Sequence, residues 1–248
     1  MPGQNYFLIS ALPAIGELGS TPPLKPAQLL THISENAAAT ALVEYLFLGD
    51  DLLQRQGYLA GEITELDASV LTEAQARDEQ PLPGYLIKGG QAEDELEDEP
   101  VNRRLIQEDD IWDAYYHRGA WLAGRLSSPF LSAWIGFEVG LRNALAVARS
   151  QVLGLDSDDY LVASELADTE QDFELLLGEW TSAQTPLAGL RVLDNGRWNW
   201  LAQNDFWFTF KNDELAAYAA RLMLLNRWDR LSHLERDNSA VANKPEPE

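Results

Sequence analysis

The chain of 248 residues is long enough for one large domain or two small ones, and its 46% hydrophobic content is typical of a folded protein with a sizeable core. Its formal net charge of −22, from 40 acidic and 18 basic residues, opposes binding to nucleic acids and to anionic lipid surfaces and favours basic partners. The absence of cysteine excludes disulfides, thiolate metal sites and cysteine nucleophiles, and it fits a reducing compartment.

The N-terminal segment, residues 1–13, lacks the basic region of a signal peptide, and its apolar run stops at Pro13. We therefore expect this segment to be part of the fold. No run of eighteen or more uncharged apolar residues occurs anywhere in the chain. We expect no direct membrane insertion, so that any contact with a membrane is made through another protein.

A first helical pair is predicted after the proline-rich loop at residues 21–26. Helical periodicity begins at Pro26, breaks near residues 34–36 and continues to Leu53. Residues 62–104 then change character, with several prolines and glycines and the acidic run Glu93–Pro100. We interpret this region as an acidic, flexible insertion whose acidic run is a solvated loop, with a site for a basic partner as the alternative.

Two long helices are predicted next, one from Asp109 to about Leu126 and one from Pro129 to Val152. Ser128 is a favourable N-cap before a proline at the first helical position. Because the connection is so short, the two helices should form an antiparallel hairpin. The pair Gly136 and Gly140 within the second helix predicts a close approach by another helix.

The last third of the chain predicts shorter helices at residues 170–180 and 186–201, the latter with a possible break at Asn195-Gly196. The aromatic residues 204–211 are compatible with a short strand or a loop. A final helix is predicted to begin with Asp213 as its cap. The sequence as a whole predicts a single, mainly α domain over residues 1–236, a helical bundle built from antiparallel hairpins, followed by a disordered tail at residues 237–248.

The residues that usually carry chemistry are poorly placed for it. His32, His117 and His233 stand far apart without a metal-ligand spacing, so we expect no metal site. We expect no cofactor either, since no glycine-rich phosphate loop occurs, and Gly-x-Ser-x-Gly is also absent. The tryptophan-rich segments lack the interleaved basic residues that stacking on single-stranded nucleic acid requires, which argues against nucleic acid as a partner.

Glu138 stands out because it interrupts an apolar helix one turn before Arg142. It could be a perturbed carboxylate in a catalytic cleft, or one half of a structural ion pair. We favour the structural interpretation, since no histidine or second isolated carboxylate can be associated with it. Trp200 and Trp207 lie near loops, where aromatic residues often serve as interface anchors, and are possible interface residues.

Three segments carry a resemblance to a known family: Asn5–Pro13, Trp134–Leu145 and Leu190–Trp198. They resemble a bacterial family encoded within operons for V-type (A/V-type) ATP synthases, whose members look like a reduced version of the C subunit, the counterpart of the eukaryotic d subunit. The likeness extends from the N-terminus to about Trp228, outside the acidic region. Its motifs are aromatic and helical signatures rather than a catalytic fingerprint.

The resemblance implies a helical, funnel-like protein that is not an enzyme. Such a protein belongs to the central stalk and couples stalk rotation to the membrane rotor ring in proton or other ion transport. Its partners would be central-stalk subunits and the rotor ring, and its place would be cytoplasmic, peripheral to the inner membrane. An acidic adaptor or assembly factor of the same complex is the alternative, and a carboxylate-dependent hydrolase around Glu138 is a further one.

The resemblance also implies a buried polar network that fixes helix geometry. The positions that match the polar residues of the family pattern are Glu138, Arg142, Asn143, Asp194 and Arg197. If Glu138 and Arg142 are both buried, Glu138→Ala should lower the free energy of unfolding by about 3 kcal/mol.

Overall fold

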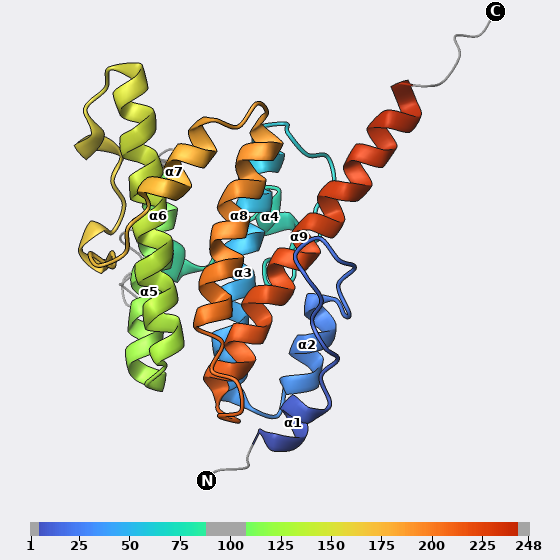
Figure 1. The fold of residues 1–248 in the computed structure, drawn as a ribbon. Coiled ribbons are helices and arrows are strands. Elements are labelled where there is room, and N and C mark those ends of the chain that lie inside the picture. The colour runs from blue at the N-terminus through green and yellow to red at the C-terminus, as the bar shows by residue number, and fades with distance from the viewer. Residues whose placement is uncertain (1–4, 88–107, 243–248) are drawn as a thin grey trace, which may run out of the picture. The chain divides into compact units, whose positions relative to one another are not determined.

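The computed structural model describes residues 5–87 and 108–242, with the side chains of residues 234–242 left out. The described residues are mainly helical and contain no strand, which confirms the predicted all-α fold (Figure 1). The chain divides into two compact units, where the sequence predicted a single domain over residues 1–236. Unit 1 comprises Met1–Asp50 and Asp194–Glu248, and unit 2 comprises Asp51–Leu193.

Unit 1 is built around the long C-terminal helix α9 (Asn212–Ala242). The short helices α1 (Tyr6–Ser10) and α2 (Pro26–Ile33) belong to this unit, and α2 lies beside α9 (Figure 1). The first part of α3 (Ala37–Leu59) and the second part of α8 (Pro186–Gln203) complete it. Apolar side chains of these helices form its core, among them Leu29, Ile33, Leu42, Leu46, Leu201, Leu215, Leu222 and Leu225.

Three asparagine side chains fix the N-terminal segment to unit 1. The amide of Asn5 donates to Asn212 at 2.8 Å, and the amide of Asn36 donates to Asn5 at 2.7 Å and to Asn212 at 2.9 Å. A further contact joins His32 of α2 to the carbonyl oxygen of Leu8, at 2.9 Å. The prediction that the N-terminal segment is part of the fold is confirmed for residues 5–13.

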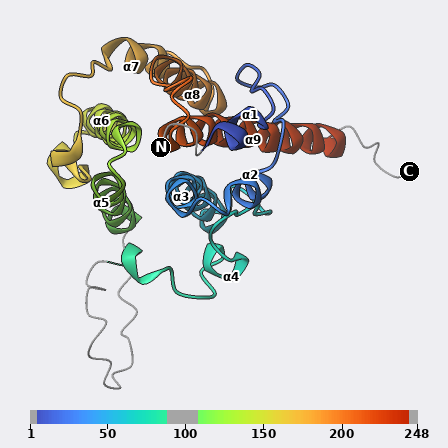
Figure 2. The ribbon, with the colours of Figure 1, turned by 90° about the horizontal axis from the view of Figure 1, so that it is seen from below.

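Unit 2 contains the predicted antiparallel hairpin. Helices α5 (Glu108–Leu126) and α6 (Pro129–Leu153) lie side by side and are joined by only two residues (Figure 2). The hydroxyl of Ser128 accepts the backbone N–H of Leu131 at 3.2 Å, which confirms the predicted cap. Gly154 ends α6 with a φ of 68°, a conformation that glycine adopts without a steric penalty.

The chain after α6 returns along that helix rather than adding another long one. It contains the short 3₁₀ helices η2 (Ser157–Tyr160) and η3 (Ser164–Leu166), then α7 (Glu174–Thr181) and the start of α8. At Gly136 the backbone N–H of Asp168 donates to the glycine carbonyl at 3.0 Å, and the ring of Phe173 lies against Gly140. The predicted close approach therefore exists, but an irregular segment makes it instead of a helix.

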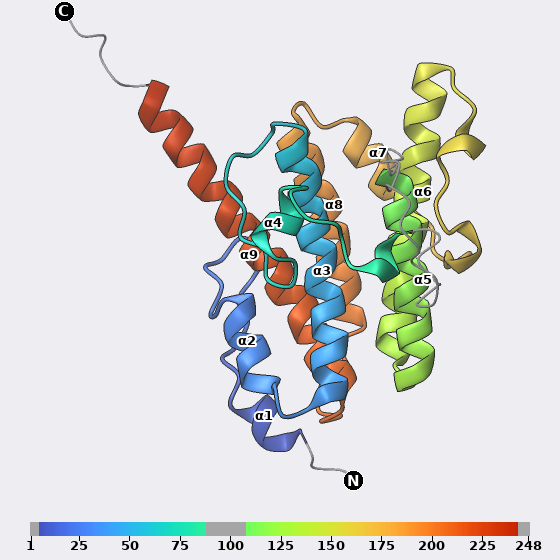
Figure 3. The ribbon, with the colours of Figure 1, turned by 180° about the vertical axis from the view of Figure 1, so that it is seen from behind.

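The first part of the predicted flexible insertion is packed. Residues 62–87 include α4 (Glu73–Ala76), labelled in Figure 3, and η1 (Gly84–Leu86). The side chains of Leu71, Leu82 and Leu86 are buried. The prediction was wrong for these residues because it overlooked Asp51, whose carboxylate accepts the backbone N–H groups of residues 69, 70 and 71. Residues 88–104, with the acidic run, lie outside the described residues.

Three further differences concern the last third of the chain. Helix α8 runs through Asn195-Gly196 without a break, since contacts of the adjacent residues outweigh the roughly 1 kcal/mol cost of a helical glycine. Residues 204–211 form a loop, one of the two predicted alternatives, but α9 begins at Asn212, one residue before the predicted cap. The predicted tail starts inside α9, which continues to Ala242; residues 243–248 lie outside the described part.

Candidate functional site

A buried ionic network occupies unit 1, and Asp194 is its centre. The Asp194 side chain is 0% exposed and accepts hydrogen bonds from Arg227 at 3.0 Å, from Arg197 at 3.1 Å and from the indole N–H of Trp228 at 3.0 Å. Arg197 lies one turn further along α8, whereas Arg227 and Trp228 belong to α9. The network therefore joins these two helices through charged hydrogen bonds.

Asp50 of α3 extends this network. The guanidinium of Arg227 bridges Asp194 and Asp50, with its Nε 3.2 Å from Asp50, and Arg230 pairs with the other carboxylate oxygen of Asp50. Burial alone would raise the pKa of Asp50, but the charges of Arg230 and Arg227 outweigh it and lower that pKa below its ordinary value. Burial likewise opposes the charge of Arg227, but Asp194 and Asp50 raise its pKa. These contacts thus favour the ionised forms of Asp50 and Arg227.

The hydrogen bonds of this network indicate a structural role rather than a catalytic one. Each of its carboxylates is occupied by arginine or indole donors, which leaves a substrate no free general base there. Asp194 and Arg197 were predicted from the sequence, whereas Asp50, Arg227 and Arg230 were missed. The missed residues carry no local signal, since Asp50 and Arg227 are 177 positions apart in the chain.

The other predicted polar residues belong to unit 2, and two of them, Glu138 and Arg142, are less buried than expected. Arg142 of α6 pairs with Asp109 of α5 at 2.8 Å and lies over the ring of Trp112, 5.1 Å from its centroid. Its side chain is 28% exposed, and Glu138 is also partly exposed. Glu138, Arg142 and Asn143 thus contribute to a helix hairpin in unit 2, whereas Asp194 and Arg197 lie in unit 1.

Asn143 is a buried polar residue of α6, as predicted. Its side-chain amide donates to the carbonyl of Val162 at 3.0 Å, and its side-chain oxygen accepts the N–H of Val162 at 3.0 Å. This pair of hydrogen bonds holds the segment after η2 against α6 and satisfies two buried backbone groups at once. Asn143 is therefore a positioning residue of the fold.

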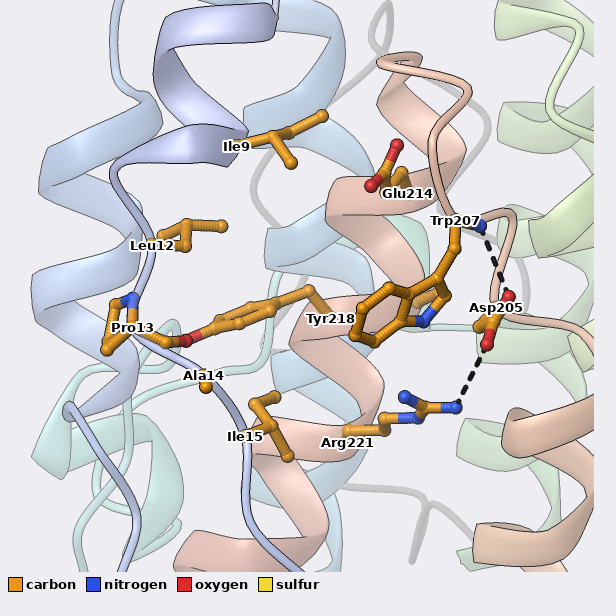
Figure 4. A pocket seen from close by; sticks show the side chains of 11 residues that line it. Ile9, Leu12, Pro13, Ala14, Ile15, Asp205, Trp207, Glu214, Tyr218 and Arg221 are labelled. Atoms are coloured by element: carbon orange, nitrogen blue, oxygen red, sulfur yellow. Dashed lines mark hydrogen bonds and ion pairs between the residues drawn. The ribbon is translucent and has the colours of Figure 1, made fainter.

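A pocket of about 260 Å³ opens in unit 1, between the N-terminal segment and α9 (Figure 4). Residues 9–15 form one wall, α9 contributes a second wall, and the loop before α9 closes the pocket with the indole of Trp207. Its lining is mostly apolar and includes Ile9, Leu12, Pro13, Ala14, Ile15, Trp207 and Ala217. Pockets for drug-sized ligands or cofactors usually exceed about 300 Å³, so this one has the size for a smaller group.

The polar groups of the pocket come from α9 and the loop before it. The hydroxyl of Tyr218 donates to the carbonyl of Pro13 at 2.9 Å, and burial raises the pKa of this tyrosine to about 12. Arg221 donates to the carbonyl of Leu201 at 3.0 Å and lies 3.5 Å from Asp205 (Figure 4). Burial lowers the pKa of Arg221, and Asp205 opposes this shift. The pocket is therefore preformed by fixed hydrogen bonds.

The two tryptophans predicted as interface residues have different environments. Trp200 is 9% exposed and belongs to the core, so its prediction as an interface residue was wrong. Trp207 is 57% exposed and lines the pocket. The sequence could not separate them, because both lie close to the same loop. The difference arises because Trp200 still belongs to α8, whereas Trp207 follows its end.

The described residues contain no group of three histidine, aspartate or glutamate side chains that could hold a metal ion. Across residues 5–87 and 108–242, none of the helices combines the length and the apolar character needed to cross a lipid bilayer.

Comparison with known proteins assigns the chain to a family. No curated protein and no solved structure matches it. The family described as "Protein of unknown function (DUF2764)" matches residues 24–238, which span α2 to α9 and thus both units. The pocket residues of α9 and the whole ionic network lie within this match. The chain therefore belongs to the DUF2764 family of proteins of unknown function.

Proposed function

We propose that this protein is a non-catalytic component of the central stalk of a bacterial V-type ATP synthase, similar to the C subunit, and that it couples stalk rotation to the membrane rotor ring. The observation that carries the proposal is the resemblance of Asn5–Pro13, Trp134–Leu145 and Leu190–Trp198 to that family. These segments contribute to α1, α6 and α8, and each has fixed polar contacts, through Asn5, Asn143 and Asp194. The resemblance thus concerns residues that shape the fold.

The distribution of charge supports an association with basic protein surfaces. Several of the 18 basic residues are used inside the protein: the side chains of Arg55, Arg197 and Arg227 are largely buried and paired with carboxylates. Cations that are neutralised internally add little to the external field. The acidic excess is therefore presented mainly at the surface, where it would attract a basic end of a stalk protein and repel anionic lipid head groups.

In this proposal the protein is cytoplasmic and peripheral to the inner membrane, held there by the rotor ring and the stalk. It needs no catalytic residue, because the chemistry of ATP belongs to other subunits of such a complex. A rigid helical unit suits the transmission of torque. The ionic network of Asp50, Asp194, Arg197, Arg227 and Arg230 would provide that rigidity within unit 1 by joining three helices.

The test is purification of the tagged protein from its own cells under gentle detergent, with quantitative mass spectrometry of the proteins that remain bound. We expect rotor-ring and central-stalk subunits in fixed stoichiometry with the protein, in a fraction that hydrolyses ATP. Untagged cells processed in parallel provide the control. Recovery of the protein alone, or with unrelated enzymes, would overturn the proposal.

The same experiment separates the proposal from the adaptor or assembly-factor alternative, which the acidic surface also suits. An assembly factor would be recovered with incomplete intermediates and would be absent from the active, fully assembled complex. A stalk component would be present in that complex at a constant ratio. The comparison therefore requires that the active complex is also purified through a tag on another of its proteins.

A further inference from the structure

Exposed aromatic side chains lie on two of the segments that line the pocket of unit 1, helix α1 and the loop before α9. Tyr6 and Phe7 of α1 are 49% and 81% exposed, and Trp207 and Phe208 of the loop before α9 are 57% and 79% exposed. The ring of Tyr6 lies 5.1 Å from that of Phe210, which connects the two groups. We call Tyr6, Phe7, Trp207, Phe208 and Phe210 the aromatic rim. Clustered exposed aromatics of this kind are typical of interaction sites rather than of free surface.

The loop that carries the rim has an unusual backbone. Phe206, Phe208 and Phe210 all have positive φ values, of 55°, 62° and 53°. Bulky residues rarely adopt this conformation, and it persists only where surrounding contacts impose it. Every second residue of this loop segment thus has a positive φ. With this backbone, Trp207 lies in the pocket wall and Phe208 is exposed.

Glu214 imposes this loop conformation. Its carboxylate accepts the backbone N–H of Phe208 at 3.2 Å and that of Phe210 at 2.8 Å. Glu214 also lines the pocket, and no lysine or arginine of the described residues lies within ion-pair distance of it. Arg221, the cation of the pocket, is paired with Asp205 instead. The pocket therefore contains one carboxylate whose charge lacks a cationic partner in the described part of the chain.

From these observations we infer that the pocket and its aromatic rim form the docking site for a protein segment in which an apolar side chain stands next to a lysine or arginine. The apolar side chain fills the 260 Å³ pocket, which is small for a cofactor but suited to a single side chain. The neighbouring cation meets Glu214. The net charge of −22 favours the approach of a basic segment.

This inference rests on the proposed function, and it names the region of the protein that would bind the central stalk. The partner is a basic segment of a central-stalk protein. Its binding buries the exposed rings of the rim, and such aromatic contacts around a filled pocket commonly supply most of the affinity of an interface. The preformed state of the pocket, fixed by Tyr218 and Glu214, reduces the ordering that binding would otherwise require.

A pocket-filling variant tests this inference. Ala14 lines the pocket and is exposed, so Ala14→Trp should fill the cavity without removing any contact of the fold. Ala60→Trp is the matched control, because Ala60 is also exposed and belongs to unit 2. Binding of purified central-stalk subunits is measured for the wild type and both variants, with circular dichroism as the test of folding. We expect at least about a tenfold loss of affinity for Ala14→Trp and none for Ala60→Trp.

A photo-crosslinking residue at position 207, compared with one at the exposed position 175, locates the contact independently of any loss of binding. Crosslinks from position 207 to a stalk peptide with an apolar residue beside lysine or arginine support the inference. Undiminished stalk binding by Ala14→Trp, or crosslinks only from position 175, would overturn it and leave the proposed function intact. If the wild type binds none of the stalk proteins, the proposed function and this inference both fail.

Discussion

Asp194 is the least exposed charged residue among the described residues of unit 1. It is fully buried, and three donors converge on its carboxylate. Asp194→Asn keeps the size of the side chain but removes the charge that Arg227 requires. Because breaking a buried ion pair leaves its partner uncompensated, we expect the free energy of unfolding to fall by about 3 kcal/mol. Urea denaturation monitored by circular dichroism measures this change.

The control for this variant is an exposed ion pair. Glu73 of α4 and Arg77, the residue that follows this helix, form such a pair, with side chains 70% and 36% exposed. Glu73→Gln should change the free energy of unfolding by less than about 1 kcal/mol, as expected for surface pairs. If Asp194→Asn proved no more damaging than Glu73→Gln, the ionic network could not be a main support of unit 1.

The lowered pKa of Asp50 predicts how the stability of the protein depends on pH. Its pKa is lowered from the ordinary value of 3.8, because Arg230 and Arg227 outweigh the effect of burial. A carboxylate with a lower pKa in the folded state stabilises the fold above the unfolded value, and this stabilisation is lost as the pH falls through the folded value. We therefore expect the free energy of unfolding to decrease below about pH 4.

The contribution of Asp50 is isolated by comparison with Asp50→Asn in urea titrations at several pH values between about 3 and 7. The variant should be less stable than the wild type at pH 7, and the difference should narrow as the pH falls below about 4. A difference that stays constant over this range would show that ionisation of Asp50 contributes no stability.

Glu138 is expected to contribute less to the free energy of unfolding than its place in an apolar helix indicates. Its neighbour Arg142 is partly exposed and is paired with Asp109 on the adjacent helix, so Arg142 keeps a partner when Glu138 is removed. We now expect Glu138→Ala to cost about 1 kcal/mol or less, rather than the roughly 3 kcal/mol of a fully buried pair. Thermal unfolding of this variant should be compared with that of Asn143→Ala.

Asn143→Ala is the informative comparison because it leaves both backbone groups of Val162 without their partner. Each buried group that loses its hydrogen bond costs about 1–3 kcal/mol. The Asn143 variant should therefore melt at a clearly lower temperature than the Glu138 variant. The opposite order would restore Glu138 as the main polar residue of α6.

Within α6, the contact with the returning chain depends on Gly140. A Cβ atom at this position would lie 2.9 Å from the ring of Phe173, which is buried. Gly140→Ala should therefore lower the free energy of unfolding by about 1–3 kcal/mol through overpacking, although alanine is the better helix former. The change is measured by urea denaturation, and NMR or near-ultraviolet circular dichroism should report the displaced aromatic ring.

Gly124 provides the matched control in the neighbouring helix α5. A Cβ atom there would meet nothing within 4 Å, so only helix propensity should change. Gly124→Ala is expected to stabilise the protein by about 0.5–1 kcal/mol. The two substitutions are chemically identical and should have opposite signs. Equal effects would mean that the returning chain does not pack closely on α6 in solution.

Much of the helical pattern was predictable, because it depends on local signals. The apolar periodicity and the cap at Ser128 predicted α5, α6 and their hairpin. The packing of residues 62–87 was not predictable, since it depends on Asp51, whose carboxylate binds backbone groups about twenty positions away. Composition indicated a flexible insertion there, but one buried carboxylate with three N–H donors overrides that tendency.

The candidate site was predicted only in part for the same physical reason. Asp194 and Arg197 lie on one helix and were recognised, but the other half of their network comes from α3 and α9. Trp207 was recognised as an aromatic residue near a loop. The pocket that it closes could not be foreseen, because its opposite wall is formed by residues 9–15 at the other end of the chain.

At the scale of the molecule, a single helix of unit 1 contributes to both the ionic network and the pocket. Helix α9 supplies Arg227 and Arg230 to the ionic network and Tyr218 and Arg221 to the pocket. A docking surface anchored in this way retains its geometry before the partner binds, which reduces the entropic cost of association. The network thus links the stability of unit 1 to the proposed stalk contact.

The net charge of −22 predicts how salt affects the thermal stability of the protein. Like charges on the surface repel one another in the compact state, and salt reduces this repulsion as the Debye length falls from about 30 Å at 0.01 M to about 8 Å at 0.15 M. The buried pairs of Asp50 and Asp194 are screened much less. Raising NaCl over this range should therefore increase the melting temperature by roughly 2–4 °C, equivalent to about 1 kcal/mol. Choline chloride at equal ionic strength should have the same effect if screening is the cause, whereas a melting temperature that falls with salt would mean that attractive surface ion pairs outweigh the repulsion.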